Sequence, residues 1–177
     1  MKIALSTITA SLISIVLAGC GGSSSADVTP EAVTPVSLDG SKYVLATEPE
    51  GAIGVIAARE SAADGEPIVV VGRIGGAANP WIDGRAAFML LDASMLMVAD
   101  GTESAEGEIC MDDCCASERA ATTTLVKVVD ANSQVLAADA RQLLGVAEND
   151  MVVVRGKVHK DDNGNFVVLA DGVHVRR

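Results

Sequence analysis

The sequence contains few aromatic and few basic residues, and both shortages exclude classes of function. Aromatic residues make up 2% of the 177-residue chain, as one Trp, one Tyr and two Phe. The core must therefore be aliphatic, and a binding surface built from stacked rings is nearly excluded. Lys and Arg number 13 against 24 Asp and Glu, so the formal net charge is −11. Such a chain repels a nucleic-acid backbone unless a local basic patch forms.

Common catalytic motifs are missing as well. The only histidines are His159 and His174, which cannot supply a His-based triad. The sequence has no serine nucleophile elbow, no phosphate-cradling glycine loop and no His-Glu-x-x-His motif. Hydrophobic residues nevertheless make up 49% of the chain, enough for a real core. We therefore expect a globular domain that is not an enzyme.

The N-terminal segment carries the most specific motif of the chain. Met1-Lys2 is positively charged, and residues 3–18 are apolar apart from scattered Ser and Thr. This stretch is short for a bilayer span but suits the apolar part of an export signal. It ends in Leu17-Ala18-Gly19-Cys20, which resembles the lipobox of bacterial lipoproteins at all four positions. The resemblance implies a signal peptide over residues 1–19, cleavage before Cys20 and acylation of that residue, for example with palmitate.

The lipobox resemblance also implies a location. Two or three acyl chains on Cys20 would hold the protein on a membrane, on the periplasmic or cell-surface side. Residue 21 is Gly rather than Asp, so the familiar inner-membrane retention signal is missing and the outer membrane is the expected location. The alternative, a retained transmembrane helix, needs a longer apolar run. Residues 20–41 are rich in Gly, Ser, Thr and Pro, which is typical of a lipidated N-terminus followed by a flexible tether.

The globular part of the chain is expected to begin at residue 42. Residues 42–65 contain Pro49 and then apolar residues at helical spacing, which predicts an N-terminal helical segment that ends at Ser61. Residues 66–177 alternate β-branched runs with turn signals, and a short helix is predicted over 138–146. Near the C-terminus, Asn163-Gly164 indicates the turn of a final hairpin.

Two of the predicted strands share a pattern. Residues 69–74 and 152–158 are β-branched runs interrupted by Gly, each with a basic and a β-branched residue near its end. Glycine within a strand often marks a bulge or the sharp coil at which a small barrel closes. The pattern resembles the OB-fold modules of secreted bacterial proteins. This resemblance implies a mainly β fold: a small five-stranded OB-like barrel with a short N-terminal helix and a short helix between strands 3 and 4. A small open β-sandwich is the alternative.

An OB-like barrel does not by itself define a function. In the nucleic-acid-binding branch, strands 2 and 3 present aromatic and basic side chains, whereas the predicted strand 2 here holds only Phe88. Basic residues near the strand ends could form a cationic patch or simply solvate the barrel surface; they are Arg73, Arg85, Arg155 and Lys157. Nucleic-acid or oligosaccharide binding is therefore an alternative suggested by the fold alone.

Three cysteines besides Cys20 lie in an acidic insertion, residues 93–120, between predicted strands 2 and 3. A disulfide from Cys110 to Cys114 or Cys115 would staple this insertion in an oxidising compartment and leave one thiol over. Three thiolates also suit a soft metal ion such as Cu(I) or Zn²⁺, and a redox-active thiol is the third possibility. We expect the insertion to be irregular and to protrude from the barrel.

Two classes of function follow. The first is a membrane-anchored, non-catalytic OB-like lipoprotein of the cell envelope that binds or has a structural role, with the lipid on Cys20 as its only prosthetic group. Its partner, an envelope protein or a small ligand, is not identified by the sequence. The second is a metal-binding or thiol-redox lipoprotein that uses Cys110, Cys114 and Cys115.

The lipobox yields a direct prediction. Replacing Cys20 with Ser removes the thiol to which the lipid is joined, so the variant should leave the membrane fraction or remain uncleaved. Fractionation and the intact mass of the purified protein measure both outcomes. Cys115→Ser is the matched control and should still partition into membranes. A Cys20→Ser variant that stays with membranes after washing in high salt would show that the lipobox interpretation is wrong.

Overall fold

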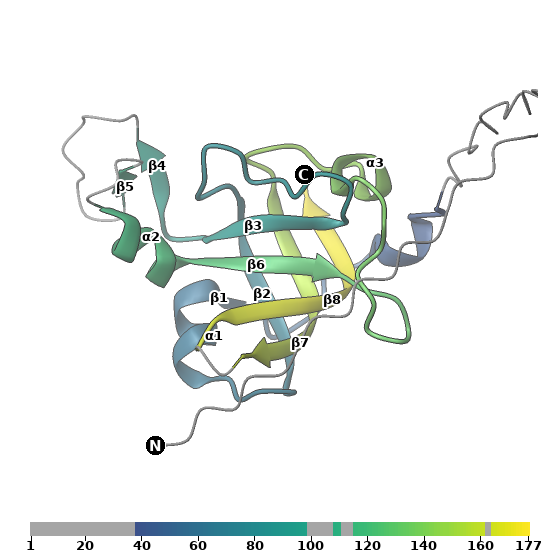
Figure 1. Ribbon diagram of the computed structural model, residues 1–177, viewed down its shortest axis with the longest axis horizontal. Helices are drawn as coiled ribbons and strands as arrows, with labels where there is room; N and C mark the ends of the chain where they lie inside the picture. Colours follow the sequence, from purple (N-terminus) through teal and green to yellow (C-terminus); the bar gives the residue numbers. More distant parts are fainter. Residues whose placement is uncertain (1–37, 99–107, 111–114, 162–163) are drawn as a thin grey trace, which may run out of the picture. The chain divides into compact units, whose positions relative to one another are not determined.

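The computed structural model describes residues 38–98, 108–110, 115–161 and 164–177. The expected signal peptide, Cys20 and most of the expected tether therefore lie outside the described residues. Where the structure describes the chain, it is mainly β, as the sequence predicts. The short helices and one small two-stranded sheet lie around a larger sheet (Figure 1).

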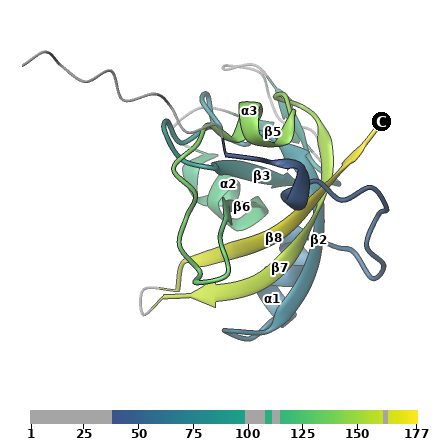
Figure 2. The same cartoon turned by 90° about the vertical axis from the view of Figure 1, so that its right-hand side faces the viewer.

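Five strands of the larger sheet form a closed barrel. In spatial order they are β2 (Pro67–Ile74), β3 (Ala87–Asp92), β6 (Thr123–Val128), β8 (Phe166–Arg176) and β7 (Met151–Lys160). β7 pairs back with β2, and Figure 2 shows the strands curving around a common interior. The pairing of β6 with β8 is parallel, whereas the other barrel pairings are antiparallel. Closure confirms the OB-like barrel and excludes the open sandwich.

Two predicted helices and one strand that the sequence does not predict complete the architecture. β1 (Ile53–Gly54) pairs in parallel with β2 and leads into α1 (Val55–Ser61). The short helix predicted between strands 3 and 4 is α3 (Ala140–Leu144). The Asp139 side chain caps its first turn, and Gly145 ends it in a left-handed conformation with φ of 64°.

The N-terminal helix begins later than the sequence predicts. A short 3-10 helix, η1 (Ser41–Tyr43), comes first, and the chain then runs beside β8. The N–H of Leu45 donates to the carbonyl of Val173 at 2.8 Å, and Nδ1 of His174 lies 2.9 Å from the carbonyl of Leu45. These contacts hold the backbone near Leu45 in an extended conformation. The prediction of a helix that starts near Pro49 is therefore wrong by about two turns.

The barrel interior is filled by aliphatic side chains, as the shortage of aromatics requires. Val70, Val153 and Val168, which the strand assignment places among buried positions, are 0% exposed. Val70 and Val168 belong to the main interior cluster, whereas Val153 alternates with the cluster members Val152 and Val154 and is buried on the other face of its strand. Phe88 is the largest of the completely buried side chains, and it lies in the main cluster with Val70 and Val168. The bulge predicted near the glycine of the fourth barrel strand is also confirmed, since the register of β7 against β8 shifts between Arg155 and Gly156.

The insertion between β3 and β6 is more regular than predicted. β4 (Leu96–Val98) and β5 (Glu108–Cys110) pair in parallel, and α2 (Ala116–Thr122) leads directly into β6. They lie beyond one end of β3 and β6 (Figure 1). The Oγ1 atoms of Thr122 and Thr123 donate to carbonyls of α2, which joins the helix to the strand. Residues 99–107 and 111–114 of the insertion lie outside the described residues.

A buried carboxylate links β3 to α1. Asp92 is 4% exposed and accepts hydrogen bonds from the N–H of Ile56 at 2.9 Å and from the N–H and Oγ of Ser94 at 2.9 and 2.6 Å. Burial raises the pKa of Asp92, but these bonds together with one from the N–H of Val55 outweigh it, so the pKa lies below its ordinary value of 3.8. A Cβ at Gly54 would lie 2.5 Å from Oδ2, so a larger residue there would displace the carboxylate. Asp92 thus caps a helix that begins far away in sequence.

This cap predicts a specific stability loss. Asp92→Ala leaves N–H groups at the start of α1 without their acceptor, so the free energy of unfolding should fall by about 2–3 kcal/mol. Urea denaturation at pH 7 measures the loss. The control is Asp171→Ala, which removes an exposed carboxylate paired with Arg155 and should cost under about 1 kcal/mol.

The same carboxylate predicts a dependence on pH. The pKa of Asp92 is lower in the folded chain than its ordinary value of 3.8. The ionised side chain therefore makes its full contribution to the free energy of unfolding above pH 3.8, and this contribution is lost as the pH falls through the pKa of the folded state. The stability difference between the natural chain and Asp92→Ala should therefore shrink in acid. An equal difference at pH 7 and well below pH 3 would contradict this assignment.

Candidate ligand-binding groove

The outer face of β3 and β6 is an apolar strip that carries one cation. Residues alternate along both strands, with Phe88 and Val126 in the barrel interior and their neighbours facing outward. Met89 of β3 lies directly opposite Leu125 of β6, and both are partly exposed. Ala87 lies opposite Lys127 in the same way. The strip therefore offers aliphatic contact along its length and a positive charge near one end.

Segments on either side of the strip form walls, so that the strip becomes the floor of a groove. One hollow of about 260 Å³ lies at the Lys127 end. The loop between β2 and β3 supplies two of its walls, Ile82 and Arg85, and the connection after β6 supplies Val135. Ile82 is 43% exposed, so its side chain offers apolar surface to this hollow. The lining residues of this hollow are Ile82, Arg85, Ala87, Leu125, Lys127 and Val135.

A second hollow of about 400 Å³ continues the groove along β6. It shares Leu125 and Lys127 with the first hollow, so the two form one surface, which we call the β3–β6 groove. α1 and the β7–β8 hairpin form its other walls. The remaining lining residues are Arg59, Met89, Ala120, Thr123, Thr124, Asp161, Asn165, Phe166 and Val167.

Two cations of the groove differ from three of the arginines elsewhere on the barrel. Within the described residues, neither Arg85 nor Lys127 forms an ion pair. By contrast, three arginines outside the groove each contact a carboxylate; the pairs are Arg141–Asp139, Arg155–Asp171 and Arg176–Glu48. In a chain with a net charge of −11, cations that lack such a neighbour create a local positive potential.

Two further cations lie at the other end of the groove and cover its only aromatic ring. The guanidinium of Arg59 donates to the carbonyl of Thr123 at 3.1 Å and lies 5.7 Å from the ring centre of Phe166. The ammonium of Lys160 lies 5.7 Å from the same ring. Phe166 is 4% exposed, so it offers no free face for stacking. The carboxylate of Asp161 accepts hydrogen bonds from Asn165.

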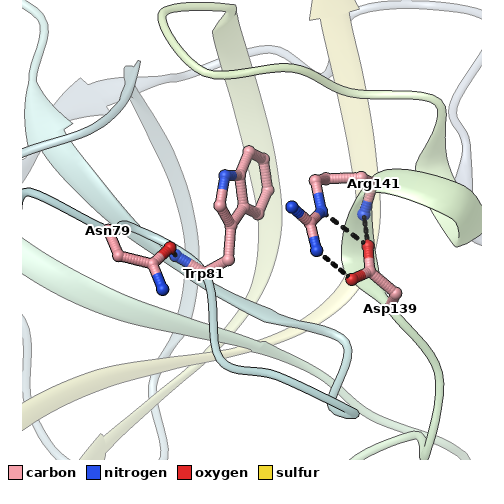
Figure 3. A network of polar contacts seen from close by, with 4 residues as sticks. All are labelled: Asn79, Trp81, Asp139 and Arg141. Atoms are coloured by element: carbon pink, nitrogen blue, oxygen red, sulfur yellow. Dashed lines mark hydrogen bonds and ion pairs between the residues drawn. The ribbon is translucent and has the colours of Figure 1, made fainter.

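A polar network beside the groove orders the loop that carries Ile82 and Arg85. Figure 3 shows Trp81 with its ring beside the guanidinium of Arg141, whose central atom is 5.4 Å from the ring centre. The Nε of Arg141 in turn donates a hydrogen bond to the carboxylate of Asp139 at 2.9 Å. The side-chain oxygen of Asn79 accepts a hydrogen bond from the backbone N–H of Trp81 at 3.2 Å. The hydrogen bond from Arg141 is the main cause that lowers the pKa of Asp139 to about 2. The loop is therefore tied to α3 by a stacked and ion-paired arginine.

The structure separates the basic residues that the sequence grouped together. Arg85 lines the groove, whereas Arg155 and Lys157 line another hollow over β2 and β7. Arg73 of β2 donates to the carbonyl of Asn149. The four residues therefore do not form a single patch. The groove instead combines Arg85 with Lys127 and Arg59, which sequence position alone did not bring together.

The predicted cysteine site is only partly described. Cys110 ends β5, although its side chain lies outside the described part, as does all of Cys114. Cys115 is half-buried and comes just before α2. Among the described residues, no group of three or more His, Cys, Asp or Glu side chains is placed to hold a metal ion. Disulfide, metal and redox roles for the three cysteines stay predictions.

Comparisons with known proteins do not assign the chain to a family. No protein-family model matches it, and no curated protein is similar to it. In the part of the chain that the structure describes, no helix is both long enough and apolar enough to span a membrane. The functional argument therefore rests on the groove and on the N-terminal motif.

The network around Trp81 predicts a spectroscopic change. Trp81 is the only tryptophan, so the fluorescence of the chain reports on this loop. Arg141→Gln removes the cation beside the ring and the ion pair with Asp139, so the emission should shift to longer wavelength and acrylamide should quench it more strongly. Arg155→Gln removes an equally exposed, carboxylate-paired arginine and should leave the spectrum unchanged. The same spectrum for all three chains would show that Arg141 does not order the loop.

Proposed function

We propose that the protein is a membrane-anchored, non-catalytic binding module of the cell envelope whose OB-like barrel binds its ligand in the β3–β6 groove. The lipobox resemblance and the tether composition support the anchor and the location. The buried barrel interior supports a ligand site on the outside, because Phe88, Leu90 and Val126 are 0% exposed and belong to one hydrophobic cluster. The groove is the observation that carries the binding role.

The position of the groove favours binding over a purely structural role. It follows the second and third barrel strands, and it extends from the loop after the first strand to the hairpin between the last two. OB-fold proteins bind their ligands on this face and with these loops. Exposed Ile82 together with Arg85 and Lys127 offers a ligand both apolar contact and charge, at one place on an otherwise acidic protein.

The chemistry of the groove favours binding over catalysis. Among the described residues, its lining contains no His, Cys or Ser, and Asp161 is the only carboxylate there. The Thr123 and Thr124 hydroxyls donate to backbone carbonyls at 2.6 and 2.9 Å, so they are occupied by structural hydrogen bonds. General acid–base and nucleophilic steps need an activated group that these residues do not supply.

A comparison of two charge reversals tests the proposed function. The full chain is cross-linked in membranes, and its captured envelope components are compared with those of Lys127→Glu and Lys157→Glu. Both lysines lie on barrel strands, but only Lys127 lines the groove. The Lys157→Glu variant should still capture an envelope component that the Lys127→Glu variant no longer captures. Both variants should show the same thermal unfolding transition as the natural chain. Loss of that component in Lys157→Glu with retention in Lys127→Glu would contradict a ligand site in this groove.

Metal and thiol analysis of the same purified chain tests the second class of function. Bound Zn or Cu in stoichiometric amount, removed by substitution of Cys110 and Cys115, would support a metal-binding lipoprotein. Absence of metal together with groove-dependent capture would support the binding module alone.

A further inference from the structure

We infer that the β3–β6 groove binds an extended acidic peptide segment, with an apolar side chain lying between two of its carboxylates. This inference rests on the proposed function, because it names the ligand of the same groove. It is drawn from the order of cations and apolar side chains along β6 and from the absence of an accessible ring.

The spacing of the cations matches an extended chain. Lys127 marks one end of the groove, and Arg59 is fixed at the other by its hydrogen bond to the carbonyl of Thr123. Residues 123 and 127 of one strand are about 13 Å apart, since a strand rises about 3.3 Å per residue. An extended peptide covers the same distance in four residues, and its side chains at positions i and i+4 share one face. Carboxylates at those positions would therefore reach both cations.

The floor between the cations is suited to an apolar side chain. Leu125 lies midway between residues 123 and 127 and faces the same side of the barrel, with Met89 directly opposite on β3. A peptide side chain at i+2 would lie over this pair. Burial of aliphatic surface against Leu125 and Met89 gives affinity that does not depend on salt. The carboxylates then give specificity and a salt-dependent contribution.

The two ends of the groove are not electrostatically equal. At the Lys127 end, Arg85 adds a second cation, and the lining of that hollow contains no carboxylate. At the Arg59 end, the carboxylate of Asp161 also lines the hollow. The peptide carboxylate beside Lys127 and Arg85 should therefore contribute more to affinity than the one beside Arg59.

A peptide fits these observations better than a single-stranded nucleic acid. Bases bind such grooves by stacking on exposed aromatic side chains. Among the described residues, Phe166 is the only ring that lines the groove, and it is buried beneath Arg59 and Lys160. The net charge of −11 also opposes a continuous phosphate backbone more than it opposes two carboxylates.

The test uses the full lipidated chain in detergent and two labelled peptides. One has the sequence Gly-Glu-Thr-Leu-Thr-Glu-Gly, and the other replaces both Glu residues with Gln. Fluorescence anisotropy should show that the Glu peptide binds about tenfold more tightly, because three cations face two carboxylates. Raising the salt to about 0.5 M should reduce this preference, since exposed charges are then screened.

Variants assign the preference to the groove. Arg85→Gln with Lys127→Gln should weaken binding of the Glu peptide about fivefold and leave the Gln peptide nearly unchanged. Leu125→Ala should weaken both peptides, since it removes the apolar floor. Lys157→Gln, a cation on β7 outside the groove, is the matched control and should change neither affinity.

Three results would overturn the inference. They are equal binding of the two peptides, tighter binding of a single-stranded oligonucleotide of similar length, and no binding of either peptide. In each case, if Lys127→Glu still fails to capture the envelope component that the natural chain captures, the groove does bind a ligand, but that ligand belongs to another chemical class. Loss of that groove dependence would instead contradict the proposed function itself.

Discussion

Closure of the barrel depends on two places where the backbone of one strand passes so close to its neighbour that no side chain fits between them. A Cβ at Gly72 of β2 would overlap the carbonyl of Leu91, and a Cβ at Gly156 of β7 would overlap the carbonyl of Leu169. Gly72 pairs with Val152, and Gly156 lies at the bulge of β7, so both glycines belong to the two strands that close the barrel. Strands that coil this sharply need such positions.

Closure also decides where a ligand can bind. A five-stranded barrel is narrow, and its strands here direct Val, Leu and Phe side chains into one buried interior cluster. The proposed ligand site therefore lies on the outside of the barrel, beside the loops that border it. The loop after β2 can do so because the stacked Arg141 and the side chain of Asn79 hold Trp81 in place. The groove thus depends on contacts that are themselves outside it.

The sequence predicts those parts of the fold that have local causes. Glycine-interrupted β-branched runs mark β2 and β7, and α3 lies within the short helix that the sequence predicts over residues 138–146. It does not predict the start of α1, because the cap of that helix is Asp92 at the end of β3. α2 escapes prediction for a similar reason: its junction with β6 depends on hydroxyl contacts of threonines that also have high strand propensity.

The candidate site is harder to foresee than the fold. In the sequence, Arg85 is only one basic residue among several. Sequence position does not show that Arg85 lies on a different side of the barrel from Arg155 and Lys157. Arg59, Arg85 and Lys127 meet in one groove only because a helix, a loop and a strand converge there. No spacing along the chain encodes that convergence, whereas the lipobox is contiguous and can be identified from the residues alone.

The parallel pairing of β6 with β8 has a kinetic consequence. Parallel neighbours cannot be joined by a tight turn, and the chain between β6 and β8 contains α3 and the whole of β7, so the pairing of β6 with β8 joins segments that are distant in sequence. Pairing of β2 with β7 likewise joins segments that are distant in sequence. Topologies dominated by such non-local contacts fold in milliseconds to seconds rather than microseconds. During that interval the aliphatic strands are exposed, and the high negative charge of the chain disfavours their association with other copies.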